Sequence, residues 1–137
     1  LVGKIVDERI KKLINEKSFI NYISPKPAHE LLDIYRENDI FVMPSITETF
    51  GLVYAEAISQ GLPVIYTRGQ GFDKQFDEGL VGYSVDCTDI NEIAGRIIDI
   101  INNYENISKS CVELSDKFDW VKISDKYKEI YSSCTNM

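Results

Sequence analysis

Two glutamates, Glu48 and Glu56, stand with seven residues between them, and Gly51 lies in that interval. Ionised carboxylates are strong hydrogen-bond acceptors, so each acid could bind hydroxyl groups of a ligand. Glycine has no Cβ atom, so the backbone at Gly51 could approach a phosphate closely. If a helix begins there, its free N–H groups and positive dipole end favour an anion. The pattern suits a ligand with phosphate in the middle and hydroxyl groups at both ends, such as a nucleotide sugar.

The same residues also have a purely structural interpretation. Ser45 and Glu48 match a capping box, in which two side chains bind free N–H groups at a helix start. Glu56 would then be a solvated residue on the helix surface. Spacing alone leaves both interpretations open, because short motifs often match by chance.

The residues around the two acids predict one βαβ unit. The apolar run 39–43 is short, rich in branched and aromatic side chains and closed by Pro44, which favours a strand buried on both faces. A helix is expected from about residue 51 to about residue 60, because Gly61 suits a left-handed cap and Pro63 prevents continuation. In an open α/β sheet, ligands bind outside the carboxyl ends of the strands. Both acids would therefore lie at or near that edge.

The rest of the chain continues the alternation of strands and helices. Strands are expected near 1–3, 18–23, 62–67 and 80–85, and helices near 6–17, 27–35, 90–104, 107–117 and 119–133. Asp89 should cap the helix 90–104. The buried face of this helix is expected to consist of isoleucines: Ile90, Ile93, Ile97, Ile98 and Ile101. The alternation predicts an α/β fold, a three-layer sandwich in which helices cover both faces of a parallel sheet.

Composition narrows the class of protein further. The chain has 137 residues, of which 44% are hydrophobic and 27% charged, as in ordinary globular proteins, so we expect a single domain. The net charge of −7 argues against a nucleic-acid partner, which would need a basic face. The cysteines, Cys87, Cys111 and Cys134, lack metal or redox spacing, and we expect reduced thiols in a cytoplasmic protein.

The segment 45–65 resembles the E-x7-E region of retaining glycosyltransferases of the GT4 type, which have the GT-B fold. The usual form is a strand, then E-G-F-G-L, a helix with the second glutamate, and G-x-P-V-I. This chain reads E-T-F-G-L from Glu48, has Glu56 in the helix, and reads G-L-P-V-I from Gly61. It departs from the pattern at Thr49.

The resemblance extends to both sides of this segment. Residues 71–82 resemble the family's glycine-containing loop and turn, although Asp73 and Lys74 replace the usual Pro-Glu. Residues 27–45 resemble P-x-x-E-L-x-x-x-Y-x-x-A-D-x-F-V-x-P-S, and residues 118–127 resemble the family's F-S-W-x-x-x-A-x-x-Y ending. The likeness spans essentially the whole chain.

This resemblance implies the Rossmann-like C-terminal half of a GT-B enzyme. Such an enzyme transfers a sugar from a nucleotide diphosphate sugar to an acceptor hydroxyl with retention and without a metal or other cofactor. Glu48 would position the donor sugar, Glu56 would bind the ribose, and the amides near Phe50, Gly51 and Leu52 would face sugar and diphosphate. Further donor-binding positions would be Ile23 and Ser24 near the base, and Gly71 and Phe72 near the sugar.

The resemblance also implies that residues 1–137 form the donor-binding domain of a longer enzyme. The chain opens with Leu1 rather than Met, which leads to the same expectation of a fragment. An N-terminal acceptor domain, the first strand or strands of this domain and the family's Arg and Lys that clamp the diphosphate would be absent. The fragment alone is then expected to be inactive. The acceptor would be a carbohydrate or lipid-linked, and the missing domain could attach the enzyme to the inner membrane face. Polysaccharide biosynthesis would be the pathway.

Several alternative interpretations fit the same residues. A GT-B phosphorylase or epimerase would share the sheet, and a flavodoxin-like or receiver-like binding domain would share the alternation of elements. Ile23 and Ser24 could form a plain turn, and Arg68 could pair with phosphate or only with solvent. His29, the single histidine, is expected to be an exposed residue at a helix start.

Overall fold

The computed structural model describes residues 1–135, which form two compact units, one from Leu1 to Ile34 and one that begins at Tyr35. Helix α2 (Ala28–Arg36) contains the last residues of the first unit and the first two of the second. The expected organisation of the whole chain as a single domain stays a prediction.

The first unit contains α1 (Glu8–Glu16) and one parallel bridge. The side chain of Asp7 caps α1 by accepting a hydrogen bond from the backbone N–H of Arg9. Val2 and Ile23 form an isolated parallel bridge. The expected strand at 18–23 was therefore wrong in extent, because only the short segment 1–3 runs beside it and a strand needs a partner of matching length.

The second unit contains a parallel sheet of three strands. These are β1 (Phe41–Val42), β2 (Val64–Thr67) and β3 (Gly82–Val85), in the spatial order β1-β2-β3. The expected strands are confirmed in place and direction but are shorter than predicted. β2 is buried along its whole length, as a central strand of a parallel sheet should be.

Helices α3 (Leu52–Ser59) and α4 (Ile90–Asn102) pack on opposite faces of this sheet. The ring of Tyr66 in β2 contacts Tyr54 of α3, with ring centroids 6.2 Å apart. Successive strand residues point to opposite faces, so Ile65 and its paired neighbour Tyr83 point away from α3. There the guanidinium of Arg96 in α4 lies 4.9 Å from the Tyr83 ring centroid. The predicted three-layer arrangement is confirmed.

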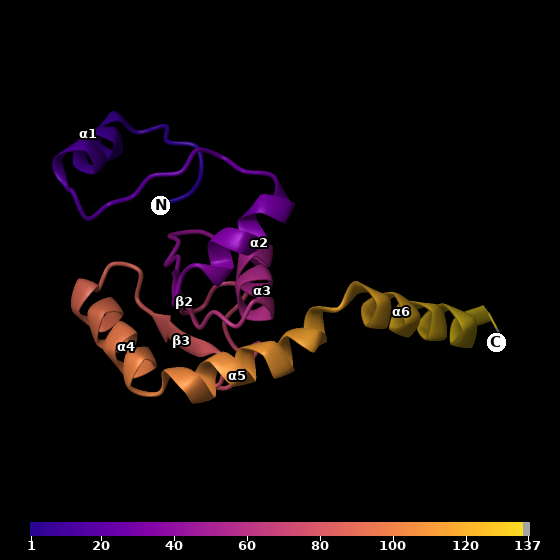
Figure 1. Ribbon diagram of the computed structural model, residues 1–137. Helices are drawn as coiled ribbons and strands as arrows, with labels where there is room; N and C mark the ends of the chain where they lie inside the picture. Colours follow the sequence, from indigo (N-terminus) through magenta and orange to yellow (C-terminus); the bar gives the residue numbers. More distant parts are fainter. Residues whose placement is uncertain (136–137) are drawn as a thin grey trace. The chain divides into compact units, whose positions relative to one another are not determined.

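The chain ends in two further helices. α5 (Tyr104–Ser115) packs against α3 and buries Ile107 and Cys111. A 3-10 turn, η1 (Asp116–Phe118), leads to α6 (Trp120–Thr135), which contacts η1 and extends from the end of α5 in Figure 1. None of the helices within residues 1–135 combines the length and apolar character needed to cross a membrane.

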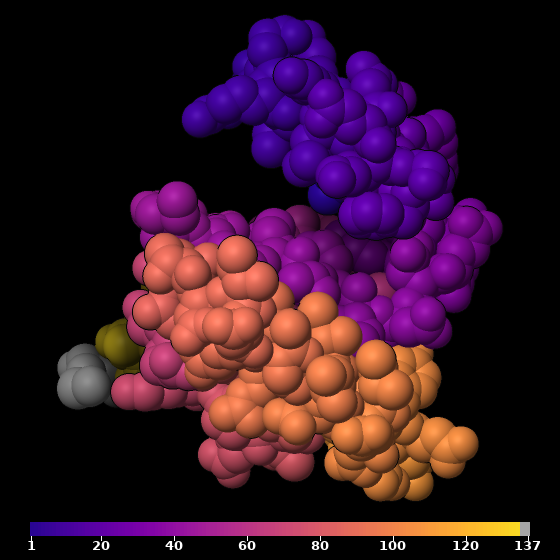
Figure 2. Space-filling view, turned by 90° about the vertical axis from the view of Figure 1, so that its left-hand side faces the viewer, coloured from indigo at the N-terminus to yellow at the C-terminus, as the bar shows by residue number. Residues whose placement is uncertain are grey.

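The predicted buried face of α4 was partly wrong. Ile93 and Ile97 are partly buried and Ile100 is fully buried, while the side chains of Ile90, Ile98 and Ile101 are exposed. At 100° per residue, the isoleucines of α4 cover an arc wider than the roughly 100° stripe that a packed helix buries. The sheet covers one margin of that arc. The other margin lies at the surface, and α4 occupies much of the face shown in salmon and orange in Figure 2.

Candidate functional site

The loop 45–51 leaves the carboxyl end of β1 and is held by residues that follow β2. The hydroxyl of Thr67 donates a hydrogen bond of 2.7 Å to the Ser45 carbonyl oxygen. The backbone N–H of Glu48 donates one of 2.9 Å to Oε1 of Gln70. These bonds join the loops after two neighbouring strands at the same edge of the sheet, which is the edge where ligands of α/β proteins bind.

Gly51 is the N-cap of α3 and has a left-handed backbone, with φ of 77°. A Cβ atom at this position would lie 2.5 Å from the Tyr54 ring, so only glycine fits. No side chain caps α3 at Gly51. The capping-box interpretation of Ser45 and Glu48 was therefore wrong, because the helix begins too late in the sequence for those residues to form it.

Tyr54 fixes the first turn of α3 to the end of β1. Its hydroxyl donates a hydrogen bond of 2.5 Å to the carbonyl oxygen of Met43, the residue that follows β1. Burial raises the pKa of Tyr54 to about 12, so its hydroxyl stays protonated and can donate at neutral pH. The N-terminal end of α3, with its positive dipole, is thereby held at the carboxyl edge of the sheet.

Glu48 lies in a hollow at the start of α3. The hollow has a volume of about 590 Å³, and its lining runs from the loop 45–51 into the helix: Glu48, Thr49, Phe50, Gly51, Leu52 and Val53. Glu48 is partly buried. An acidic side chain and the first backbone groups of a helix thus border the same space.

Glu56 lies in an adjoining groove of about 660 Å³ between α3, α5, η1 and the start of α6. Phe50 and Leu52 line both this groove and the hollow of Glu48. Glu56 comes four residues after Leu52, a rise of about 6 Å along the helix axis. The hydroxyl of Tyr35 donates a hydrogen bond of 3.2 Å to its Oε2 atom. The two glutamates therefore border neighbouring spaces, one at the first turn of α3 and one a turn further.

The loop 68–81 completes the edge through Gly71 and Phe72. Gly71 lies directly against the backbone of Thr49. The ring of Phe72 is only 1% exposed and packs against Phe50, Tyr54 and other rings. The side chain of Phe72 therefore belongs to the core, which leaves its backbone as the part that could contact a ligand.

Arg68 has a partner that the sequence analysis did not foresee. Its guanidinium pairs with the Glu92 carboxylate and reaches the Ser84 carbonyl oxygen at 3.4 Å. Glu92 also accepts a hydrogen bond of 2.8 Å from the backbone N–H of Asp86. The expectation that Arg68 pairs with phosphate or only with solvent was incomplete, because a helix carboxylate already neutralises it.

The remaining candidates lie in the first unit. Ile23 is fixed by backbone bonds, donating to the Leu1 carbonyl oxygen at 2.8 Å and accepting from the Gly3 N–H at 3.1 Å. Ser24 follows it and is exposed. Their role beside a ligand stays a prediction. His29 is exposed in the first turn of α2, as expected.

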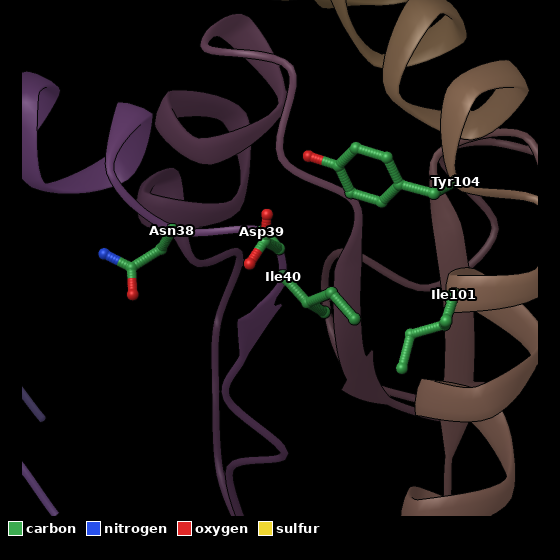
Figure 3. A pocket seen from close by; sticks show the side chains of 5 residues that line it. All are labelled: Asn38, Asp39, Ile40, Ile101 and Tyr104. Carbon is green, nitrogen blue, oxygen red and sulfur yellow. The ribbon is translucent and has the colours of Figure 1, made fainter.

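Metal-binding groups and a second pocket were also considered in the part of the chain that the structure describes. Within residues 1–135, no three His, Cys, Asp or Glu side chains form a group that could hold a metal ion. A pocket of about 520 Å³ lies at the amino end of β1, where Figure 3 shows Ile40 and Ile101 pointing toward one another and the Tyr104 ring extending toward Asp39. This is the opposite edge of the sheet from the two glutamates.

Sequence reasoning missed Tyr35 and Gln70 as parts of the site. Tyr35 was noticed as part of the segment 27–45 that resembles the family, and its polar hydroxyl was the signal that it needed a partner. Gln70 stands between two glycines, Gly69 and Gly71, and its long side chain carries both a donor and an acceptor. Their hydrogen bonds, from Tyr35 to Glu56 and from Glu48 to Gln70, join residues that are 21 and 22 positions apart in the sequence.

Comparison with known proteins shows similarity to glycosyltransferases. The D-inositol 3-phosphate glycosyltransferase of Corynebacterium efficiens is 32% identical over 119 residues, which cover 85% of this chain and 28% of that protein. The sulfoquinovosyl transferase SQD2 of Arabidopsis thaliana is 34% identical over 111 residues, which cover 76% of this chain and 22% of that protein. The chain thus spans less than a third of the length of these relatives.

Solved structures show the same fold. Sucrose-phosphate synthase from Thermosynechococcus elongatus superposes with a TM-score of 0.79 at 26% identity, over 94% of this chain and 34% of that one. HepE from Anabaena, in complex with UDP-glucose, superposes with a TM-score of 0.77 at 22% identity, over 96% of this chain and 40% of that one. The expected Rossmann-like half of a GT-B fold is confirmed.

The model of the family described as "Glycosyl transferases group 1" matches residues 2–118, most of the chain. The flavodoxin-like and receiver-like alternatives were therefore wrong. This chain belongs to the glycosyl transferases group 1 family.

Proposed function

We propose that this chain is the donor-binding portion of a GT4-type enzyme that transfers a sugar from a nucleotide diphosphate sugar to an acceptor hydroxyl with retention. One observation carries the proposal: Glu48 and Glu56 border adjoining spaces on either side of the N-terminal turn of α3. A nucleotide diphosphate sugar has hydroxyl groups at both ends and two phosphates between them. Its polar groups match that order of acid, helix N-terminus and acid.

Each residue has a defined part in this proposal. Glu48 accepts hydrogen bonds from hydroxyl groups of the sugar and so positions the anomeric carbon. The backbone N–H groups near Phe50, Gly51 and Leu52 face the sugar and the diphosphate. The positive end of α3 stabilises the charge that develops on the leaving diphosphate, which needs no metal ion in this scheme. Glu56 accepts hydrogen bonds from the ribose hydroxyls.

The other candidates complete the donor pocket. Gly71 and Phe72 present their backbone near the sugar, and Ile23 and Ser24 contact the base. The acceptor, a carbohydrate or a lipid-linked molecule, binds to a part of the enzyme outside this chain. Because the relatives are more than three times as long, we further propose that the chain alone binds donor weakly and transfers no sugar.

The test is calorimetry of the full-length enzyme with UDP, GDP and ADP. The tightest-binding nucleotide is then titrated into Glu56→Ala, which should weaken binding by about 1–3 kcal/mol, because the ribose hydroxyls lose their acceptor. Asp99→Ala is the control, since Asp99 lies on α4 across the sheet and pairs with Arg96. Binding of no nucleoside diphosphate, or equal losses in the two variants, would overturn the proposal.

A further inference from the structure

Tyr35 connects α2 to the acid that we assign to the ribose. Its hydroxyl donates a hydrogen bond of 3.2 Å to Oε2 of Glu56. We infer that Tyr35 is a positioning residue for the donor, holding one oxygen of the Glu56 carboxylate so that the other is directed to the ribose hydroxyls. The inference rests on the proposed function and adds a residue to it.

The side chain of Tyr35 is rigidly placed. It is 8% exposed, and its ring packs edge-on against Phe41 of β1, with ring centroids 5.7 Å apart. The neighbouring Arg36 donates a hydrogen bond of 2.8 Å from Nε to Oε1 of Gln60. Glu56 and Gln60 are one turn apart on α3, so Tyr35 and Arg36 bind two successive turns of that helix. The hydroxyl of Tyr35 is therefore fixed both along and around α3.

The carboxylate of Glu56 has one of its two oxygens left for a ligand. Within residues 1–135, Tyr35 is the only side chain that donates a hydrogen bond to it. Glu56 is partly buried and lines the groove beside Leu52 and Ser59. Its second oxygen can therefore accept a hydrogen bond from a molecule in the groove, and a ribose hydroxyl is such a donor.

Tyr35 stays a donor over the whole physiological pH range. Burial, and then the charge and hydrogen bond of Glu56, raise the pKa of Tyr35 to about 12. The hydroxyl proton is thus retained and points to the carboxylate. Without it, the Glu56 side chain could rotate among its staggered conformers, and ribose binding would have to order it again.

The test compares the affinity for a nucleotide with the affinity for the same nucleotide without the 2′ and 3′ hydroxyl groups of its ribose. The full-length enzyme is titrated with the tightest-binding of UDP, GDP and ADP, and with the 2′,3′-dideoxy form of the same nucleotide. Tyr35→Phe should lower the preference for the ribose form by about 3–10-fold, the order expected for the net effect of one hydrogen bond. Affinity for the dideoxy form should not change.

Tyr66→Phe is the matched control. Tyr66 is also a buried tyrosine, at 2% exposed, and its pKa is raised by burial and then by Glu78 and Asp73 rather than by Glu56. It should leave the ribose preference unchanged. In turnover, Tyr35→Phe should raise the KM for the donor with little change in kcat, because ribose contacts are equal in ground and transition states.

A double variant separates positioning from loss of stability. If Tyr35 acts through Glu56, Tyr35→Phe should cost no further ribose preference in a Glu56→Gln background. A ribose preference lost in Glu56→Gln but kept in Tyr35→Phe would overturn this inference and leave the proposed function standing. A ribose preference absent from the unaltered enzyme would overturn both. Equal losses for the ribose and dideoxy forms in Tyr35→Phe would show a general structural role and also overturn the inference.

Discussion

Gly71 lies so close to Thr49 that a Cβ atom added to Gly71 would stand 1.6 Å from the Thr49 carbonyl oxygen. The two residues belong to loops that follow different strands, β1 and β2. Their backbones can touch only because Gly71 has no side chain. The carboxyl edge of the sheet is therefore built by direct backbone contact between the segment of Glu48 and the glycine-containing loop.

Replacing Gly71 should separate these loops. We expect Gly71→Ala to lower the free energy of unfolding by about 1–3 kcal/mol, since the clash is with backbone that cannot rotate away. Urea denaturation measures the change. Gly95→Ala is the control, because Gly95 lies in α4 with nothing within 4 Å of an added Cβ, and it should stabilise by about 1 kcal/mol. A neutral Gly71→Ala would contradict the contact.

Phe72 should be among the most sensitive core positions of the second unit. It is almost fully buried, and its ring contacts Phe50, Tyr54, Tyr66 and further aromatic rings. Phe72→Ala should cost about 3–5 kcal/mol of unfolding free energy, from lost burial and the cavity left behind.

Thermal or urea unfolding followed by near-ultraviolet circular dichroism would measure this effect. Ile46→Ala serves as the comparison, because Ile46 is 82% exposed and its loss should change stability by less than about 0.5 kcal/mol. Similar effects of the two substitutions would mean that the aromatic cluster does not form the core.

Acid should weaken the bonds of Glu92. The backbone N–H of Asp86, and then Arg68, lower the pKa of Glu92 below its ordinary value of 4.5. A lowered pKa stabilises the fold above the unfolded value, and this stability is lost as the pH falls below about 4.5 through the folded value. Glu92→Gln should therefore flatten the decline of urea midpoints between about pH 5 and pH 3. An unchanged decline would contradict the role of these bonds.

The cysteines should differ in reactivity. Cys111 is buried, and burial raises its pKa to about 12, whereas Cys134 is exposed. A thiol reacts as its thiolate, so iodoacetamide near pH 8 should label Cys134 quickly and Cys111 only after unfolding. Because the pKa of Cys111 is raised, its contribution to stability should be lost as the pH rises above about 9.

Peptide mass spectrometry over a time course would resolve the labelled cysteines. Cys87 is partly buried and should react at an intermediate rate. Labelling of Cys111 as fast as that of Cys134 in the folded protein would show that α5 does not stay packed over the strand starts, where the Cys111 thiol lies 3.5 Å from the Leu62 and Val81 carbonyl oxygens.

The sequence predicted the unit around the glutamates well because its boundaries have local causes. Gly51 and Gly61 both have positive φ, and α3 occupies Leu52–Ser59, inside the predicted range. Such positions restrict the residue type directly, so they can be recognised without the rest of the fold. Asp89 is another local signal, since its side chain accepts hydrogen bonds from the first turn of α4 as expected.

Other features depend on which elements meet in space. Nothing local in α4 distinguishes Ile100, which is buried, from Ile101, which is exposed. Likewise, the bond between Tyr35 and Glu56 joins two helices, and the bond between Glu48 and Gln70 joins two loops. The period of the hydrophobic residues indicates which face of a helix is buried but not which element covers it. A hydrogen bond between residues more than twenty positions apart leaves no local pattern in the sequence.

The position of Glu56 relative to Leu52 is set by one turn of α3 rather than by a flexible loop. Inserting a single residue between Leu52 and Glu56 would rotate Glu56 by about 100° around the helix, away from both the groove and the hydroxyl of Tyr35. Substitutions along the groove would therefore keep Glu56 in place, whereas a change in length within that turn would move it out of the groove.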